Sequence, residues 1–236
     1  MAATPIFKEP KDHTVYRNDE EMVVPSVTTI LKIINKEELL YWANSLGYKR
    51  ISVRSELESH AYIGSCVHYA IDEYFKTGKI DLDSIIDERR ITENICIKNA
   101  FISFSKYFIE NRKDFEIIEN EKSISGKKFG GTIDLLAKYK KNKLILCDFK
   151  TSKDFYISMF LQLAAYDLLL KETEKMKIDG YMVILLDKKN GNKAKIKLID
   201  DKEEMKFYRE CFKKLADFYY DYYYINQKYW GKELTS

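Results

Sequence analysis

The hydrophobic and polar positions of the chain follow two different periods. Over residues 56–75 and 91–111, apolar residues recur at the three- and four-residue spacing of an amphipathic helix, and TGK ends the first of these helices at Gly78. The segments FEIIENEKSI, KFGGTIDLLAKY and KLILCDFK then read as three strands, the last two joined at KKN. A helical pattern in FYISMFLQLAAYDLLLKETEK precedes a strand pair around NGN and a tyrosine-rich helix from residue 202 to about 230.

The first 55 residues predict a small extension in front of this core. HTVYRNDEEMVV reads as a hairpin, and PSVTTILKII and EELLYWANSLG read as helices, with Ser26 as the N-cap of the first. The order of elements predicts an α/β fold, with a central mixed β-sheet of about five strands flanked by helices. No linker-like segment appears, so we expect one domain over residues 1–236, with an extension (1–55), a core (56–200) and a C-terminal aromatic-rich helix (201–236).

Charge and composition narrow the class of protein only a little. Forty basic residues against 37 acidic ones give a net charge of +3, which does not by itself indicate a nucleic-acid-binding protein. Lysines do gather in KKFGG, KYKKNK, DFKTSK and DKKNGNKAKIK, either as solvated turns or as a basic rim that meets phosphates. With no apolar signal core, no membrane-spanning run and four widely spaced cysteines, we expect a cytoplasmic protein with no membrane association.

Three charged residues stand at the ends of the two central strands. Asp134 lies in GGTIDLL, and Asp148 and Lys150 end KLILCDFK. If the turn is centred on Lys141–Asn142, paired residue numbers sum to about 283, which sets Asp134 opposite Phe149 and beside the other two. On spacing alone, a salt bridge at the end of the sheet explains these charges at least as well as a functional site.

Two neighbouring carboxylates can also hold a metal ion. They repel each other unless a proton or a cation lies between them, and oxygen ligands of this kind suit Mg²⁺ or Mn²⁺. Lys150 would face the same cavity, where it could orient or deprotonate a water molecule or offset negative charge in a phosphoryl transition state.

Four motifs in order resemble the PD-(D/E)XK nuclease superfamily. GGTID, followed by DFK, resembles its central motif. GSCVHYAID and QLAAY are similar to the Gly-x-x-x-His and Gln-x-x-x-Tyr motifs of the RecB-like exonuclease branch. VPSVTTIL with YWANSLG resembles the leader of the mitochondrial genome-maintenance exonuclease and of small phage exonucleases. The resemblance covers about residues 25–166.

The resemblance implies a role for each matching residue. His68, Asp134, Asp148 and the Phe149 carbonyl would be metal ligands, and Lys150 would be catalytic beside the two aspartates. Asp72 and Glu121 would support the ligands from beside the site. Four further residues would contact DNA: Gln162, Tyr166, Ser152 and Lys153. For His68, Gln162 and Tyr166 the alternative is ordinary helix packing. Gly130 and Gly131 would let a DNA backbone pass close to the strand.

The expected activity is that of a metal-dependent DNA exonuclease in recombination, repair or replication, acting on single-stranded or end-bearing DNA. A structure-selective endonuclease and a non-catalytic DNA-binding module are the alternatives. The chain shows neither a Walker A pattern nor the cysteine spacing of an iron–sulfur cluster, so we expect neither cofactor. Any helicase activity would come from a partner, and a bacterial or phage-infected cell would be a suitable setting.

Overall fold

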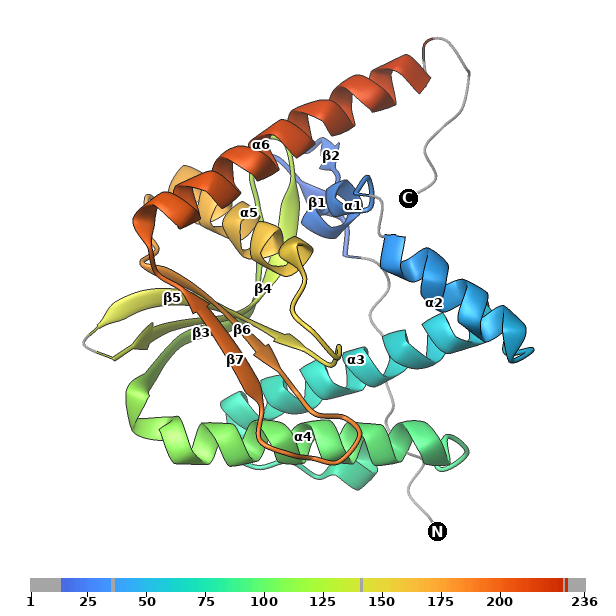
Figure 1. Ribbon diagram of the computed structural model, residues 1–236. Coiled ribbons are helices and arrows are strands. Elements are labelled where there is room, and N and C mark those ends of the chain that lie inside the picture. The colour runs from blue at the N-terminus through green and yellow to red at the C-terminus, as the bar shows by residue number, and fades with distance from the viewer. Residues whose placement is uncertain (1–13, 35–36, 141, 227, 229–236) are drawn as a thin grey trace.

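A five-stranded β-sheet with helices on both faces forms the body of the molecule (Figure 1). The computed structural model describes residues 14–34, 37–140, 142–226 and 228. The helices are α1 (Val27–Leu31), α2 (Glu37–Tyr48), α3 (Val53–Thr77), α4 (Ile91–Asn111), α5 (Ile157–Thr173) and α6 (Lys202–Ile225). Two 3₁₀ turns, η1 (Leu82–Ser84) and η2 (Arg112–Asp114), flank α4. No helix in the described part of the chain is long and apolar enough to cross a membrane.

The strands lie in the sheet in the order in which they follow along the chain. They are β3 (Phe115–Ser125), β4 (Gly130–Tyr139), β5 (Lys143–Lys150), β6 (Gly180–Leu185) and β7 (Lys195–Ile199). β5 and β6 are parallel, and the other neighbouring strands are antiparallel. Only the parallel pair needs a crossover, which α5 provides. This arrangement confirms the predicted mixed sheet flanked by helices.

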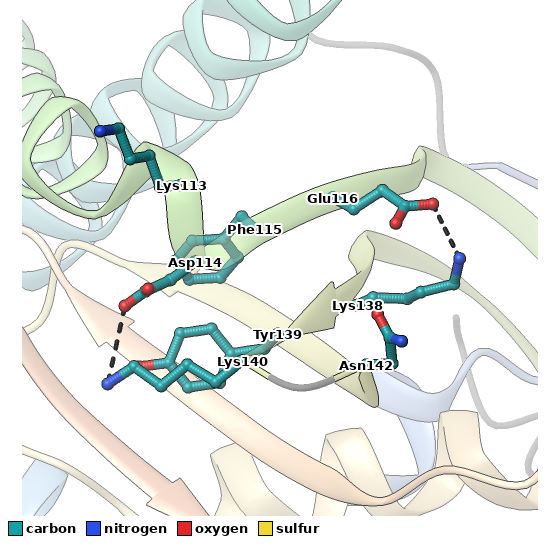
Figure 2. A pocket seen from close by; sticks show the side chains of 8 residues that line it. All are labelled: Lys113, Asp114, Phe115, Glu116, Lys138, Tyr139, Lys140 and Asn142. Carbon is teal, nitrogen blue, oxygen red and sulfur yellow. Dashed lines mark hydrogen bonds and ion pairs between the residues drawn. The ribbon is translucent and has the colours of Figure 1, made fainter.

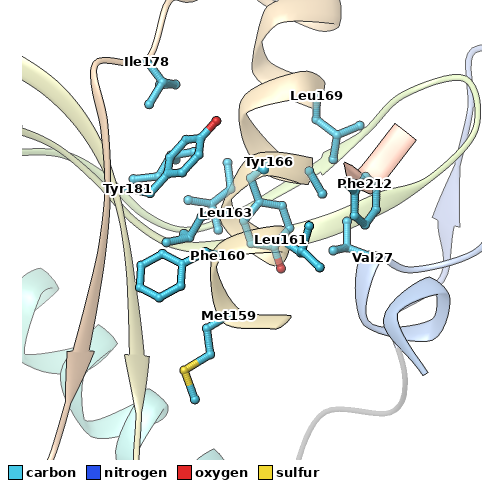
Figure 3. Close-up of a cluster of buried hydrophobic side chains, with 14 of the residues drawn as sticks. Val27, Met159, Phe160, Leu161, Leu163, Tyr166, Leu169, Ile178, Tyr181 and Phe212 are labelled. Atoms are coloured by element: carbon cyan, nitrogen blue, oxygen red, sulfur yellow. The ribbon is translucent and has the colours of Figure 1, made fainter. Parts of the chain in front are cut away.

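The sheet separates two hydrophobic clusters. On one face, α1, α5 and α6 bury residues such as Val27, Leu163 and Phe212 against the sheet, and we call this set the α5 cluster (Figure 3). On the other face, α3 and α4 bury residues such as Val67 and Phe104, which form the α3–α4 cluster. Because α5 is covered by the sheet on one side and α6 on the other, its apolar residues extend around the whole helix.

The predicted extension and helix ends are also present. β1 (Tyr16–Arg17) and β2 (Val23–Val24) form the small hairpin ahead of α1. The Ser26 hydroxyl accepts a hydrogen bond from the Thr29 N–H at 3.0 Å, as its predicted N-cap role requires. At the end of α3, Gly78 adopts a left-handed conformation with φ of +72°.

The predicted pairing of β4 with β5 is wrong by one residue. Leu135 pairs with Cys147 and the closing pair is Tyr139 with Lys143, so paired numbers sum to 282. The loop therefore contains three residues, 140–142, rather than a two-residue turn, although Lys141 itself lies outside the described residues. The backbone pairing ends at Leu135 and Cys147, so Asp134 lies just beyond it and accepts the Phe149 N–H with its side chain.

Candidate metal centre

Three side chains from three separate elements meet beside the end of β5. His68 comes from the middle of α3, Glu121 from β3 and Asp134 from β4. The imidazole Nδ1 of His68 lies 3.4 Å from the Asp134 Oδ2 and 3.7 Å from the Glu121 Oε1. One ligand atom from each of the three residues lies within 4.8 Å of the other two, a spacing that a single cation can bridge.

A local break in the strands aims Asp134 and Glu121 at this point. Ile133 belongs to the α5 cluster and Leu135 to the α3–α4 cluster, although residues two apart share a face in a regular strand. In the neighbouring strand, Glu121 has a left-handed φ of +48°, and the regular pairing resumes on both sides of it. Irregularities of this kind redirect side chains, and here they turn Glu121 and Asp134 toward His68 of α3.

Asp148 and Lys150 form a buried ion pair beside this group. The Lys150 Nζ donates to the Asp148 Oδ1 at 2.7 Å, and the Asp148 side chain is 1% exposed. The second oxygen, Oδ2, is buried without a hydrogen-bond partner among the described residues. A buried carboxylate oxygen in this condition is costly, and a cation would satisfy it.

Asp134 also fixes the end of β5. Its Oδ2 accepts a hydrogen bond from the backbone N–H of Phe149 at 2.9 Å, at the point where the β4–β5 backbone pairing ends. In a strand, the N–H and C=O of one residue point to the same side. The Phe149 carbonyl therefore faces the gap next to Asp134, which suits its predicted role as a metal ligand.

The titratable groups of the site influence one another strongly. Burial raises the pKa of Asp148 to about 7, against the opposing effect of the Lys150 ammonium and with the support of the Asp134 carboxylate. Burial alone would lower the pKa of His68, but the carboxylates of Asp134 and Glu121 outweigh it and raise the value to about 9. For Lys150 burial acts in the same downward direction, yet Asp148 and Asp134 raise its pKa above the usual value. The site thus favours positive charge among its carboxylates.

These residues fit a divalent cation. The carboxylate oxygens of Glu121, Asp134 and Asp148 match the ligands that Mg²⁺ and Mn²⁺ take in proteins, and the His68 imidazole adds a nitrogen of the kind that transition-metal ions accept. The orphaned Oδ2 of Asp148 marks where one further ligand bond would be gained. Glu121, expected only as a neighbour of the site, is one of the three residues whose ligand atoms meet, with His68 and Asp134. Asp148 lies next to them, held by its ion pair with Lys150.

The two α5 residues of the predicted motif face the same strand. Gln162 donates to the Tyr166 hydroxyl at 3.0 Å, and both side chains are buried. Burial, with the nearby carboxylate of Asp134, raises the pKa of Tyr166 well above its usual value, so the phenol stays protonated. Figure 3 shows its ring within the α5 cluster. The pair braces the strand that carries Asp134, and its predicted contact with DNA stays a prediction.

The two glycines of β4 make room for tyrosines. A Cβ built on Gly131 would lie 2.5 Å from the Tyr166 ring, and one built on Gly130 would lie 2.5 Å from the Tyr16 side chain. The expectation that these glycines leave space for a DNA backbone is therefore wrong. They let two aromatic side chains pack directly on the strand next to Asp134.

Asp72 is joined to the site through β3 and not through His68. Its carboxylate accepts hydrogen bonds from Lys76 and from Asn120, and none of the described hydrogen bonds joins it to His68. Asn120 precedes Glu121 in β3, so Asp72 ties α3 to the strand irregularity. Sequence reasoning missed Asn120, whose only signal was a polar amide next to an acid inside an alternating strand.

The last two predicted DNA contacts lie just beyond β5. Ser152 is half-buried and donates to the backbone carbonyl of Asp154 at 3.1 Å. Lys153 is exposed on the same turn. Both follow Lys150 closely in the chain, so they stand at the mouth of the site rather than within the group of ligands.

Binding of a divalent metal ion at this site is expected to stabilise the folded protein. Mn²⁺ at about 100 times its Kd should stabilise the folded protein by about 2.7 kcal/mol, which raises the melting temperature by several degrees. The shift should be measured by differential scanning fluorimetry in buffer containing either Mn²⁺ or EDTA. Glu121→Gln should reduce it, whereas Glu116→Gln, at the far end of β3, should not. Equal shifts in both variants would remove Glu121 from the group of ligands.

Comparison with known proteins assigns the chain to a family. Residues 39–226 match the family model described as the PD-(D/E)XK nuclease superfamily, and this range includes every residue of the candidate site. A solved structure titled "Crystal structure of SSO0001" aligns with 65% of this chain and 74% of its own, at 13% sequence identity and a TM-score of 0.28. A score this low supports no structural conclusion. Curated proteins give no significant match.

Proposed function

Because the chain belongs to the PD-(D/E)XK nuclease superfamily, we propose that it is a divalent-metal-dependent DNA exonuclease acting on single-stranded or end-bearing DNA. Proteins of this superfamily are generally metal-dependent nucleases. The observation that carries the proposal is the meeting of His68, Glu121 and Asp134 beside the buried Asp148–Lys150 pair. The position of His68 on α3, of the two aspartates on paired strands, and of Gln162 and Tyr166 on α5 also supports membership of the RecB-like branch.

In the proposed reaction, the cation and the protein residues have different roles. When bound, Mg²⁺ or Mn²⁺ supplies a Lewis acid that polarises the scissile phosphate and makes water a stronger nucleophile. His68, Glu121, Asp134, Asp148 and the Phe149 carbonyl would hold it.

Lys150 acts as a cation in this proposal. Its raised pKa keeps the ammonium protonated, so it favours offsetting negative charge on the phosphoryl group over accepting a proton from water. Asp148 holds the ammonium in place at 2.7 Å and leaves its other oxygen for the cation. Hydrolysis would yield a 5′-phosphate and a 3′-hydroxyl.

The residues that surround the site would position the reacting groups. Asp134 links the end of β5 to β4 through the Phe149 N–H, which fixes the carbonyl that faces the gap. Gln162 and Tyr166 brace β4 from α5, and Asp72 braces β3 from α3. Because these supports come from paired strands and from packed helices, the ligands are held in position before substrate binds.

The proposed biological setting is recombination, repair or replication of DNA in a bacterial or phage-infected cell. A helicase or recombination partner would supply unwound strands. We expect no nucleotide cofactor, because the site proposed here uses a metal ion and the phosphodiester alone.

A test of strand ends separates the exonuclease from the structure-selective endonuclease that the same fold could support. In Mn²⁺, a linear single-stranded DNA should be degraded to short products, while a circular single strand of the same sequence should persist. Blocking one end at a time with a terminal phosphorothioate cap then gives the direction of digestion. Cleavage of the circle at the rate of the linear strand would contradict the exonuclease proposal and favour the endonuclease.

A further inference from the structure

A lysine-rich hollow of about 360 Å³ lies directly beyond the ends of β5 and β6. We call it the lysine hollow and define it by its charged lining residues, which are Lys153, Asp187, Lys188, Lys189, Lys193 and Lys195. Thr151 and Ser152, which follow the catalytic lysine candidate, form its near wall. Three residues of chain span at most about 10 Å, so this wall lies close to Lys150.

The positive charge of the hollow is largely uncompensated. Lys193 forms an ion pair with Glu110 of α4. Within the described ranges, no ion pair involves the other four lysines of the hollow, Lys153, Lys188, Lys189 and Lys195. Four like charges around one hollow repel one another, and an anion placed between them would relieve that repulsion.

Among the described residues, Asp187 is the one acid in the lining, and it is already engaged by the loop that carries the lysines. The Asp187 carboxylate accepts from the backbone N–H groups of Lys189 at 3.0 Å and Asn190 at 3.2 Å. Its second oxygen accepts from the side chain of Asn192 at 2.7 Å. Asp187 therefore shapes the loop instead of pairing with a lysine.

The β6–β7 loop is anchored to α4, along which it lies in Figure 1. Asn99 donates to the carbonyl of Lys189 at 2.6 Å, and Lys106 donates to that of Gly191 at 2.7 Å. The Ser103 hydroxyl accepts the N–H of Asp187 at 3.0 Å. These contacts fix the loop before any ligand binds, which lowers the entropy cost of binding.

We infer that the lysine hollow is a phosphate-binding subsite, which holds the backbone of the DNA strand next to the phosphodiester at the metal centre. The inference rests on the proposed function and deepens it by giving the strand a path from His68 and Lys150 over residues 151–153 to the β6–β7 loop. Lysine side chains suit a phosphodiester because they contact it without regard to base sequence. Burial, aided by Lys189, lowers the pKa of Lys188, and a bound phosphate would favour its charged form.

A second hollow differs from the lysine hollow in the pairing of its charges. It has a volume of about 440 Å³ and lies at the opposite end of β4 and β5, where the chain enters β3 (Figure 2). Its charges are largely paired, Lys138 with Glu116 at 2.8 Å and Lys140 with Asp114 at 3.6 Å. Size alone would favour this hollow, but its paired charges and its distance along the sheet from the metal centre do not suit a strand that must reach Lys150.

The test measures DNA binding without cleavage. A fluorescein-labelled single-stranded oligonucleotide is titrated in EDTA, over a range of salt concentrations, against the full chain and two double variants. Lys189→Glu with Lys195→Glu reverses two exposed charges of the lysine hollow. Lys113→Glu with Lys177→Glu makes the same change of net charge at the opposite end of the sheet, on two exposed lysines. Circular dichroism confirms the fold of each.

Reversal at the lysine hollow should weaken binding about 10-fold or more at low salt, since two charge-assisted contacts are lost. The slope of log K against log salt should fall by about 1.4, the value for two phosphate contacts on a single strand. Neutral Lys189→Gln with Lys195→Gln should give an intermediate loss. The inference is overturned if the variant of the lysine hollow and its matched control bind equally and with equal slopes. The titration needs no hydrolysis, so failure of the nuclease proposal would appear in the cleavage assays instead.

Discussion

Replacing Asp134 by asparagine is expected to lower DNA hydrolysis by about 1,000-fold or more while leaving the protein folded. Asparagine keeps a carbonyl oxygen that can accept the Phe149 N–H, so the end of β5 stays in place. It removes the negative charge that faces His68 at 3.4 Å and that would hold the cation. The comparison is made from initial rates on an end-labelled single strand in Mn²⁺.

A matched control separates this effect from a general loss of charge. Asp217 lies on α6, is 62% exposed, and pairs with Lys128 of the β3–β4 turn, so Asp217→Asn removes one carboxylate from an exposed ion pair. That variant should cleave at the wild-type rate, because exposed ion pairs contribute little to stability. If the two variants cleaved equally well, Asp134 would not belong to the catalytic machinery.

Replacing Gly131 by alanine is expected to destabilise the protein by about 1–3 kcal/mol. The added Cβ would lie 2.5 Å from the buried Tyr166 ring, which cannot move without disturbing its contact with Gln162 and the packing of α5. A loss of this size lowers the melting temperature of a chain of this length by several degrees. Because β4 also carries Asp134, we expect cleavage to fall as well. Chemical denaturation gives the change in free energy directly.

Gly47→Ala is the control for this change. Its Cβ would meet no atom within 4 Å, and the residue lies in the last turn of α2, so alanine should be neutral or stabilising by up to about 1 kcal/mol. A Gly131→Ala protein as stable as the wild type would show that Tyr166 does not pack on β4 as described.

The sequence predicts the elements well where the signal is local. α4 spans the predicted residues 91–111, because an amphipathic period of that length has few alternatives. Ser26 caps the start of α1 and Gly78 caps the end of α3 as expected, since capping depends on the chemistry of single residues. The motif residues on α3, β4, β5 and α5 also fall on the predicted element types, which is why the fold class could be predicted.

The geometry of the site depended on information that is not local. One extra loop residue shifted the β4–β5 register, and the backbone pairing stops just short of Asp134 and Asp148. The left-handed Glu121 and the change of face next to Asp134 arise from the pairing of two strands, which no pattern in either strand predicts. Asp72 likewise bonds to Asn120, 48 residues away in the chain. These features could be seen only once the elements were packed.

The most direct test of the metal-dependent site compares the wild type with Lys150→Met in two measurements on the same samples. Methionine roughly keeps the length of the half-buried side chain and removes the charge that pairs with Asp148. The account predicts that the wild type cleaves an end-labelled single strand in Mn²⁺ and not in EDTA. It also predicts that Lys150→Met loses cleavage but still binds Mn²⁺ in a calorimetric titration. Cleavage by Lys150→Met at the wild-type rate, or cleavage by the wild type in EDTA, would contradict it.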